Sequence, residues 1–116
     1  MKKALVLTNG LYQTSDAKTA HGLVRGSERF LIAGIIDNTQ TANKDAGELL
    51  DSTHRNIPVF ADLAAALSTI KDADTLIIGV ATVGGKLPVE MLVIIKEAIS
   101  KGLSIVNGLH DYLNEH

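Results

Sequence analysis

Residues of types that commonly bind ligands or catalyse reactions follow several short apolar runs in this 116-residue chain. They are Asn9-Gly10, Asp37, Gly84-Gly85-Lys86 and His110-Asp111. An acidic residue at a strand end can bond a ribose hydroxyl, and paired glycines let a ligand approach the backbone closely. A histidine beside an aspartate is a conceivable general base, although one such pair does not complete an acid–base constellation. We therefore expect a ligand-binding site built from these four segments.

Each segment also has a structural interpretation. Asp37 would then be a solvated carboxylate that caps the turn into Asn38-Thr39, and Gly84-Gly85 would be an ordinary flexible loop. Lys86 adds positive charge where the helix dipole of residues 89–100 begins, which favours an anion there. His110 would contact a neighbouring domain or serve a structural role, so the catalytic residues stay unknown, with His110 and Asp111 as weak candidates.

Lys18 and Thr19 fall in the first turn of a predicted helix. They resemble the end of a phosphate-binding loop, but Tyr12 and Ala17 occupy the positions where that loop needs glycine. An anion could still bind there, because any helix N-terminus attracts negative charge. The alternative is that both are ordinary helix residues.

Several common site motifs are missing from the sequence. It contains no G-x-G-x-x-G, H-E-x-x-H or G-x-S-x-G. The four histidines have no metal-ligand spacing, so no metal site is expected. Standard NAD binding is weakly supported, because the dinucleotide-binding motif G-x-G-x-x-G is absent.

Short apolar strands alternate with helical patterns along the chain, which predicts a parallel sheet with right-handed crossovers. We expect an α/β fold: a Rossmann-like open parallel five-stranded sheet of order 3-2-1-4-5, with helices on both faces and one domain over residues 1–116. The expected strands are 3–8, 30–36, 57–60, 75–80 and 103–106. In the third of them, Pro58 suggests an edge position or a strand start, because proline has no amide donor. The expected helices begin at Ser15 or Asp16, near 46, at Asp62 (continuing through Ala64, Leu67 and Ile70) and at 89, with a further helical pattern at 109–113.

The helix expected at residues 89–100 is too apolar for an ordinary surface helix. Eight of its residues are hydrophobic, and they are distributed over most of the helix circumference: Val89, Met91, Leu92, Val93, Ile94, Ile95, Ala98 and Ile99. Something should cover its outer face, and a dimer partner and a second domain are the two physical candidates.

Composition narrows the class of protein. The net charge is -2 and aromatic residues make up 3% of the chain, so nucleic acid is not an expected partner. The chain has no cysteine, which excludes disulfides and thiolate sites. The apolar runs are too short for a membrane span, so we expect a cytoplasmic protein without a membrane partner.

Six stretches of the chain resemble the N-terminal domain of the D-glutamate N-acetyltransferase-like family, formerly a domain of unknown function. They are AKTAHGLVRG (17–26), GIIDNT (34–39), KDAGELLD (44–51), IPVF (57–60), GGKLP (84–88) and SIVNGLHDYL (104–113). The resemblance implies a Rossmann-like N-terminal module of a longer two-domain protein, whose second half carries a P-loop domain that is absent here.

The resemblance also implies a transferase context, acyl transfer to the amino group of D-glutamate, although this chain by itself is not expected to be catalytically competent. No cofactor is certain, and a nucleotide or acetyl-CoA is possible. The ligand-binding candidates at the carboxyl edge of the sheet are Asn9, Gly10, Lys18, Thr19, His21, Asp37, Gly84, Gly85 and Lys86. Expected partners are a small molecule, the P-loop domain and a second copy in a homo-oligomer. The alternatives are a free-standing nucleotide- or CoA-binding protein and a non-catalytic self-associating module.

Overall fold

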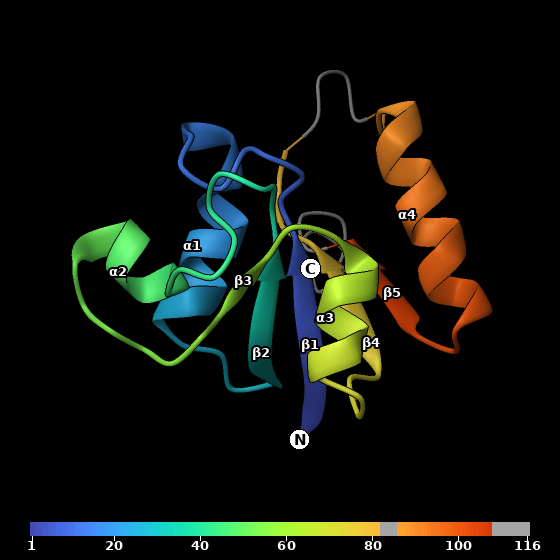
Figure 1. Ribbon diagram of the computed structural model, residues 1–116, viewed down its shortest axis with the longest axis horizontal. Helices are drawn as coiled ribbons and strands as arrows, with labels where there is room; N and C mark the ends of the chain where they lie inside the picture. Colours follow the sequence, from blue (N-terminus) through green and yellow to red (C-terminus); the bar gives the residue numbers. More distant parts are fainter. Residues whose placement is uncertain (82–85, 108–116) are drawn as a thin grey trace, which may run out of the picture.

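The computed structural model describes residues 1–81 and 86–107, which form a parallel sheet flanked by helices (Figure 1). The strand order is β3-β2-β1-β4-β5, which confirms the expected Rossmann-like α/β topology. The strands are β1 (Lys2–Leu7), β2 (Phe30–Ile36), β3 (Val59–Phe60), β4 (Thr75–Ile78) and β5 (Ser104–Asn107). The helices are a 3-10 turn η1 (Ser15–Ala17), α1 (Lys18–Arg25), α2 (Ala46–Asp51), α3 (Leu63–Thr69) and α4 (Val89–Ser100).

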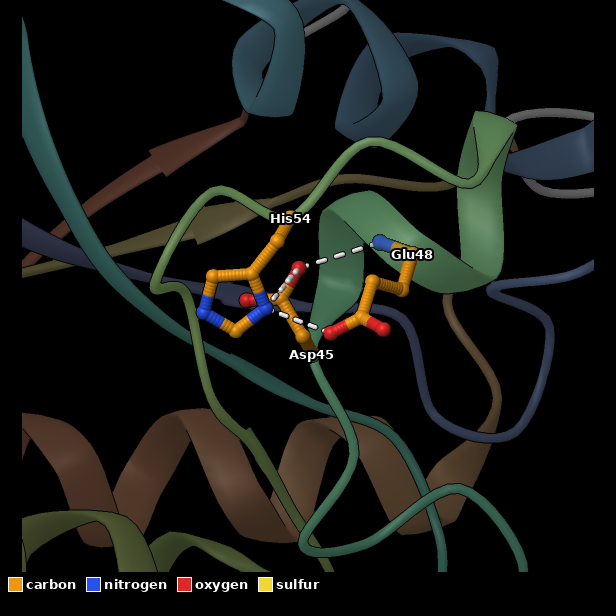
Figure 2. A group of neighbouring side chains, drawn as sticks. All are labelled: Asp45, Glu48 and His54. Carbon is orange, nitrogen blue, oxygen red and sulfur yellow. Dashed lines mark hydrogen bonds and ion pairs between the residues drawn. The ribbon is translucent and has the colours of Figure 1, made fainter.

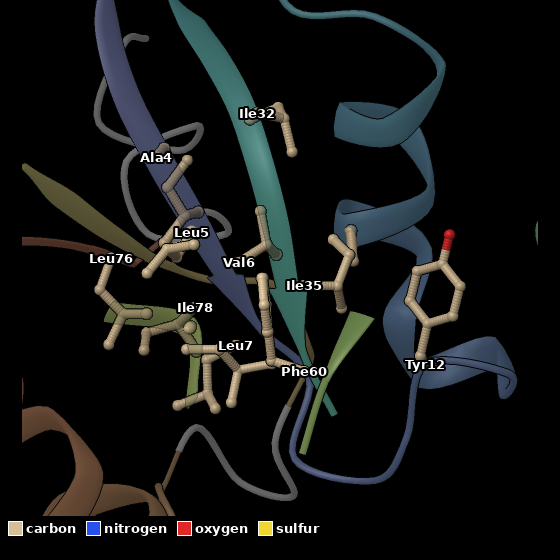
Figure 3. Packing of buried hydrophobic residues seen from close by; sticks show 14 of the residues in the cluster. Ala4, Leu5, Val6, Leu7, Tyr12, Ile32, Ile35, Phe60, Leu76 and Ile78 are labelled. Carbon is tan, nitrogen blue, oxygen red and sulfur yellow. The ribbon is translucent and has the colours of Figure 1, made fainter. Parts of the chain in front are cut away.

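Helices cover both faces of the sheet. In Figure 1, α1 and α2 lie to the left of the strands, α3 lies in front of β1 and β4, and α4 stands at the right. The helix α3 packs on β2 and β3, and α4 packs on β5. The central strand β1 is buried from Ala4 to Leu7, because helices cover it on both faces and β2 and β4 flank it (Figure 3).

A glycine lets α1 lie directly on the sheet. A Cβ at Gly79 would lie 2.5 Å from Val6 Cγ1 and 2.9 Å from Ala20 Cβ. The Ala20 amide donates to the Gly79 carbonyl at 3.1 Å, and the Ala81 amide donates to the Asp16 carbonyl at 2.9 Å. The beginning of α1 is thus fixed to the carboxyl end of β4.

One helix start differs in detail from the sequence expectation, and another agrees with it. Neither Ser15 nor Asp16 caps a helix; Thr14 accepts from the Asp16 amide and caps η1, which leads into α1. Asp62 caps α3 as expected, through a 2.8 Å bond from the Ala65 amide. The buried positions of α3 are Leu63 and Ala66, whereas Leu67 is half-buried and Ala64 is exposed.

The edge strand β3 is shorter than the expected 57–60. Pro58 precedes it, cannot donate to a ladder, and forms an isolated bridge with Asp45 instead. The edge position predicted from Pro58 is confirmed. The helical pattern expected at 109–113 lies outside the described residues.

Candidate functional site

The turn after β1 is held in place by a buried carboxylate. Asp37, 6% exposed, lies just beyond the end of β2. Its Oδ1 accepts the Thr8 hydroxyl at 2.7 Å, the Gly10 amide at 2.8 Å and the Tyr12 amide at 3.1 Å. Its Oδ2 accepts the Thr41 hydroxyl at 2.6 Å. Asp37 therefore joins the carboxyl ends of the two central strands.

The structure changes the interpretation of the turn that follows Asp37. Asn38, not Asp37, caps it: Asn38 Oδ1 accepts the amides of Gln40 at 2.9 Å and Thr41 at 3.1 Å. Asp37 is buried, so it is not the solvated carboxylate of that interpretation. A bond to a ribose stays a prediction, and it would have to share oxygens that already accept four donors from the protein.

The Asn9-Gly10 turn adopts a left-handed backbone conformation. Asn9 has φ 50° and Gly10 has φ 89°, a region that glycine tolerates best. This geometry turns the Gly10 amide toward Asp37, which explains why the turn needs a glycine there. The turn then delivers Tyr12 into the interior.

Tyr12 connects this turn to α2. Its side chain is fully buried, and its hydroxyl donates to the Ala46 carbonyl at 2.7 Å. Burial raises the pKa of the Tyr12 hydroxyl to about 12, so the group is a neutral donor at physiological pH. Tyr12 thus fixes the distance between the β1–α1 turn and the first turn of α2.

His21 on α1 packs against Tyr12 from the other side. The two rings are perpendicular, with centroids 5.3 Å apart, and His21 Nε2 is hydrogen bonded to the Tyr12 carbonyl. That bond requires Nε2 to carry the proton, because a carbonyl can only accept. Among the described residues Nδ1 has no hydrogen bond, so a ligand could use it as an acceptor.

These contacts leave a cleft of about 350 Å³ between the start of α1 and α2. It is lined by Tyr12, Gln13, Thr14, Ser15, Lys18, His21, Leu49 and Leu50. One wall therefore offers an ammonium, hydroxyls and an imidazole, and the other offers two leucines. Such a cleft suits a small ligand with an anionic group and an apolar portion.

The cleft collects only part of the expected site. Lys18 and His21 line it, whereas Thr19 does not. Asn9, Gly10 and Asp37 form the hydrogen-bonded turn described above, and Lys86 is exposed just before α4. Gly84, Gly85, His110 and Asp111 lie outside the described residues.

Several cleft residues were missed by the sequence analysis. Tyr12, Gln13, Thr14 and Ser15 belong to the loop after β1, and Leu49 and Leu50 lie on α2. Tyr12 is one of only two tyrosines and follows a strand-ending glycine, which is a usable signal. Leu49 and Leu50 carry none, because apolar residues in a short helix normally indicate a core face.

A second group of polar side chains gathers at the start of α2 (Figure 2). One carboxylate oxygen each of Asp45 and Glu48 and one ring nitrogen of His54, all atoms that could bind a metal ion, lie within 4.8 Å of one another. Asp45 caps α2 through the Glu48 amide at 3.0 Å and also accepts the amides of Arg55 at 3.0 Å and Ile57 at 2.9 Å. Spacing of histidines alone could not reveal this group, because two of its three members are carboxylates.

All three side chains of this group are engaged in hydrogen bonds. Burial by itself would raise the pKa of Asp45, but the three amide donors outweigh it and hold that pKa below its usual range. The hydrogen bond to Glu48, and then that to Asn56 Oδ1, raise the pKa of His54. An ion bound there would have to displace the hydrogen bonds of His54 to Glu48 and Asn56. The group instead closes the loop that leads from α2 to β3.

No helix among residues 1–81 and 86–107 is both long and apolar enough to cross a bilayer.

Comparison with known proteins identifies the domain. The family model of a Rossmann-like domain of unknown function, DUF1611_N, matches residues 39–116. No curated protein matches the chain. The crystal structure of a DUF1611 family protein from Anabaena variabilis ATCC 29413 superposes with a TM-score of 0.81 and 30% sequence identity, over 95% of this chain and 31% of that chain. The chain thus spans about a third of that relative's length, and it belongs to the DUF1611 family as its Rossmann-like N-terminal domain.

Proposed function

We propose that this domain is the small-molecule-binding module of a cytoplasmic, D-glutamate N-acetyltransferase-like protein and acts together with a P-loop domain. The observation that carries this proposal is the cleft beside α1, in which a lysine and a histidine face two leucines. The family membership supports the modular part, since the Anabaena variabilis relative is about three times longer than this chain.

The ligand class follows from the cleft's side chains. Lys18 supplies a point charge for a carboxylate or a phosphate at the first turn of α1, where the helix dipole also favours an anion. His21 Nδ1 accepts a hydrogen bond from an amino or hydroxyl group. Leu49 and Leu50 cover an apolar segment. D-Glutamate offers carboxylates and an amino group, whereas a nucleotide or acetyl-CoA offers phosphates.

The remaining candidates belong to the same edge of the sheet. Asn9, Gly10 and Asp37 shape the turn from which Tyr12 enters the cleft, so we assign them a positioning role. Thr19 is adjacent to Lys18, and Lys86 places a positive charge just before the beginning of α4. Gly84-Gly85 as a backbone cradle and His110-Asp111 as an acid–base pair stay predictions.

Thermal denaturation of the 116-residue chain tests the proposal. D-Glutamate, acetyl-CoA, CoA, ATP and NAD(P)H would each be added well above plausible affinity. A ligand at about 100 times its dissociation constant adds about 2.7 kcal/mol to the free energy of unfolding, which should raise the midpoint by several degrees. We expect a shift with one anionic ligand.

A matched pair of lysine variants locates the effect. Lys18→Ala should abolish the shift, whereas Lys71→Ala, an exposed lysine in the turn before β4, should leave it unchanged. A shift that survives Lys18→Ala would move the site out of this cleft. No shift with any ligand would contradict a self-sufficient site and favour one that the P-loop domain completes.

The same titration addresses the second candidate, a free-standing nucleotide- or CoA-binding protein. This second candidate is supported by the positive charge of Lys18 at the start of α1, which could bind a phosphate. A shift with ATP, CoA or NAD(P)H but none with D-glutamate would favour it.

A further inference from the structure

One side of α4 presents four large apolar side chains to solvent. Val89, Leu92, Val93 and Ile99 are 74%, 42%, 58% and 56% exposed. Their spacing places them on one face of the helix, opposite the buried Met91 and Ala98. We call these four residues the α4 stripe. The excess of apolar residues predicted from the sequence is thus confirmed as exposed surface.

The α4 stripe differs from scattered surface hydrophobics. Met91 and Ala98 already supply the contact of α4 with the sheet side, so the stripe is not needed to hold the helix in place. In Figure 1, α4 stands at the outer right of the molecule, with its far side turned away from the strands. Exposed apolar side chains gathered on one helix face in this way indicate an interaction surface.

A charged residue within the stripe indicates what covers it. Lys96 lies three residues after Val93 and three before Ile99, on the same face. Among the described residues, Lys96 is exposed and takes part in no ion pair. The α4 stripe therefore needs an occupant that is apolar but offers one carboxylate or a similar acceptor.

A second copy of the chain fits this requirement poorly. In a two-fold contact between stripes, the residues available to face Lys96 are those of the stripe itself, which contains no acidic residue. The nearest acidic residues, Glu90 and Glu97, lie at the flank of the stripe by helical spacing. In a homodimer Lys96 would therefore find a partner charge only at the edge of the contact and not within the stripe.

The length of the relative supplies a different occupant. The Anabaena variabilis protein matches this chain over only 31% of its own length, so more than two thirds of it lies outside this domain. A covalent connection gives such a companion a high effective concentration at the domain surface. Covering an apolar stripe within one chain therefore needs less intrinsic affinity than dimerisation does.

We propose that the α4 stripe docks the companion part of a DUF1611 protein, the part outside this domain, through an apolar surface that presents a carboxylate to Lys96. This inference rests on the proposed modular function, and it does not depend on the cleft beside α1.

Cysteine labelling tests the proposal, because the chain contains no cysteine of its own. Val93→Cys would be introduced into the 116-residue chain and into a chimera in which this chain replaces the matching region of the Anabaena variabilis protein. Maleimide labelling would be followed by peptide mass spectrometry. We expect labelling to slow at least about tenfold in the chimera, which corresponds to about 1.4 kcal/mol of docking free energy. Glu28→Cys, exposed in the α1–β2 connection on the opposite side of the sheet, should label equally fast in both proteins.

The charge is tested within the same chimera. Lys96→Glu should restore most of the labelling at position 93, because it places like charges together, whereas Lys96→Met should restore less of it, because the facing carboxylate loses its partner but meets no repelling charge. Equal labelling of Val93→Cys in both proteins would overturn the proposal. Protection in the isolated chain together with a dimer in sedimentation would also overturn it, in favour of a second copy.

Two further measurements keep the outcome clear. If the chimera does not fold, the cysteine is placed at the aligned position of the intact Anabaena variabilis protein, where the same protection is expected and its absence contradicts docking. The ligand titration is scored separately on the isolated chain. Protection of the cysteine without a ligand-induced shift supports the docking surface and contradicts a cleft that binds its ligand unaided. A ligand-induced shift without protection supports the cleft and overturns the docking surface.

Discussion

Replacing Asp37 by alanine should destabilise this domain more than any other single polar substitution at the carboxyl edge among the described residues. The variant removes the acceptor of four hydrogen bonds, from the hydroxyls of Thr8 and Thr41 and the amides of Gly10 and Tyr12. All four join segments that are adjacent in space and at least partly buried.

The magnitude depends on which donors find another partner. Thr8 Oγ1 can still reach the Ile36 carbonyl at 3.2 Å, Thr41 Oγ1 can reach Asn38 Oδ1 at 3.2 Å, and the exposed Gly10 amide can bond water. Only the Tyr12 amide is left buried without an acceptor. Such an orphaned donor costs about 1–3 kcal/mol, and the lost charge-assisted bonds bring the total for Asp37→Ala to about 3–5 kcal/mol.

Asp37→Asn is the matched control, because it has the same shape and keeps Oδ1 as an acceptor. Its amide nitrogen would face Thr41, whose hydroxyl can accept when its proton turns toward Asn38. We expect a loss of about 1–2 kcal/mol, from the weaker neutral bonds. Urea denaturation followed by circular dichroism measures both values.

Two results would refute this reasoning. A loss below about 1 kcal/mol for Asp37→Ala would mean that the turn after β1 does not depend on the carboxylate. Equal losses for both variants would mean that the negative charge, not the acceptor geometry, holds the turn.

Three further predictions concern the α2 side of the molecule. Tyr12→Phe should lower the free energy of unfolding by about 1–2 kcal/mol in a denaturation experiment, since a carbonyl at the start of α2 loses its donor; an unchanged value would contradict the bond. Gly47→Ala should destabilise strongly and lower the melting temperature, because a Cβ there would lie 2.2 Å from the Thr53 carbonyl oxygen, and a wild-type melting temperature would show that the loop can yield. The bond to Glu48 raises the pKa of His54 in the folded state. The stability that this bond adds should therefore be complete below pH 6.5 and should be lost as the pH rises through the raised pKa. His54→Gln should remove this pH dependence of the free energy of unfolding, and a variant that retains it would place the titration at another group.

The order of strands could be predicted because the signals are local. Continuous apolar runs such as 30–36 indicate strands buried on both faces, and their alternation with helices restricts the sheet to parallel crossovers. The bounds of β2 and α4 agree with the expectation residue for residue. Pro58 likewise predicted its own edge position from its missing donor.

Helix starts and the cleft were harder to predict. Ser15 and Asp16 are good capping residues by type, yet Thr14 caps because the chain enters a 3-10 turn before α1. Lys18 and His21 were named as candidates, but their partners across the cleft come from α2, about thirty residues further along the chain. Nothing in the local sequence around Leu49 connects it with Tyr12.

The sequence by itself determined the fold class, the strand order and the excess of apolar residues on α4, because each depends on patterns within a dozen neighbouring positions. The tertiary structure decided the role of Asp37 and the composition of the cleft. Both depend on side chains that meet only after β1, β2 and α2 are packed together, and burial then decides whether a carboxylate faces water or four donors of the protein.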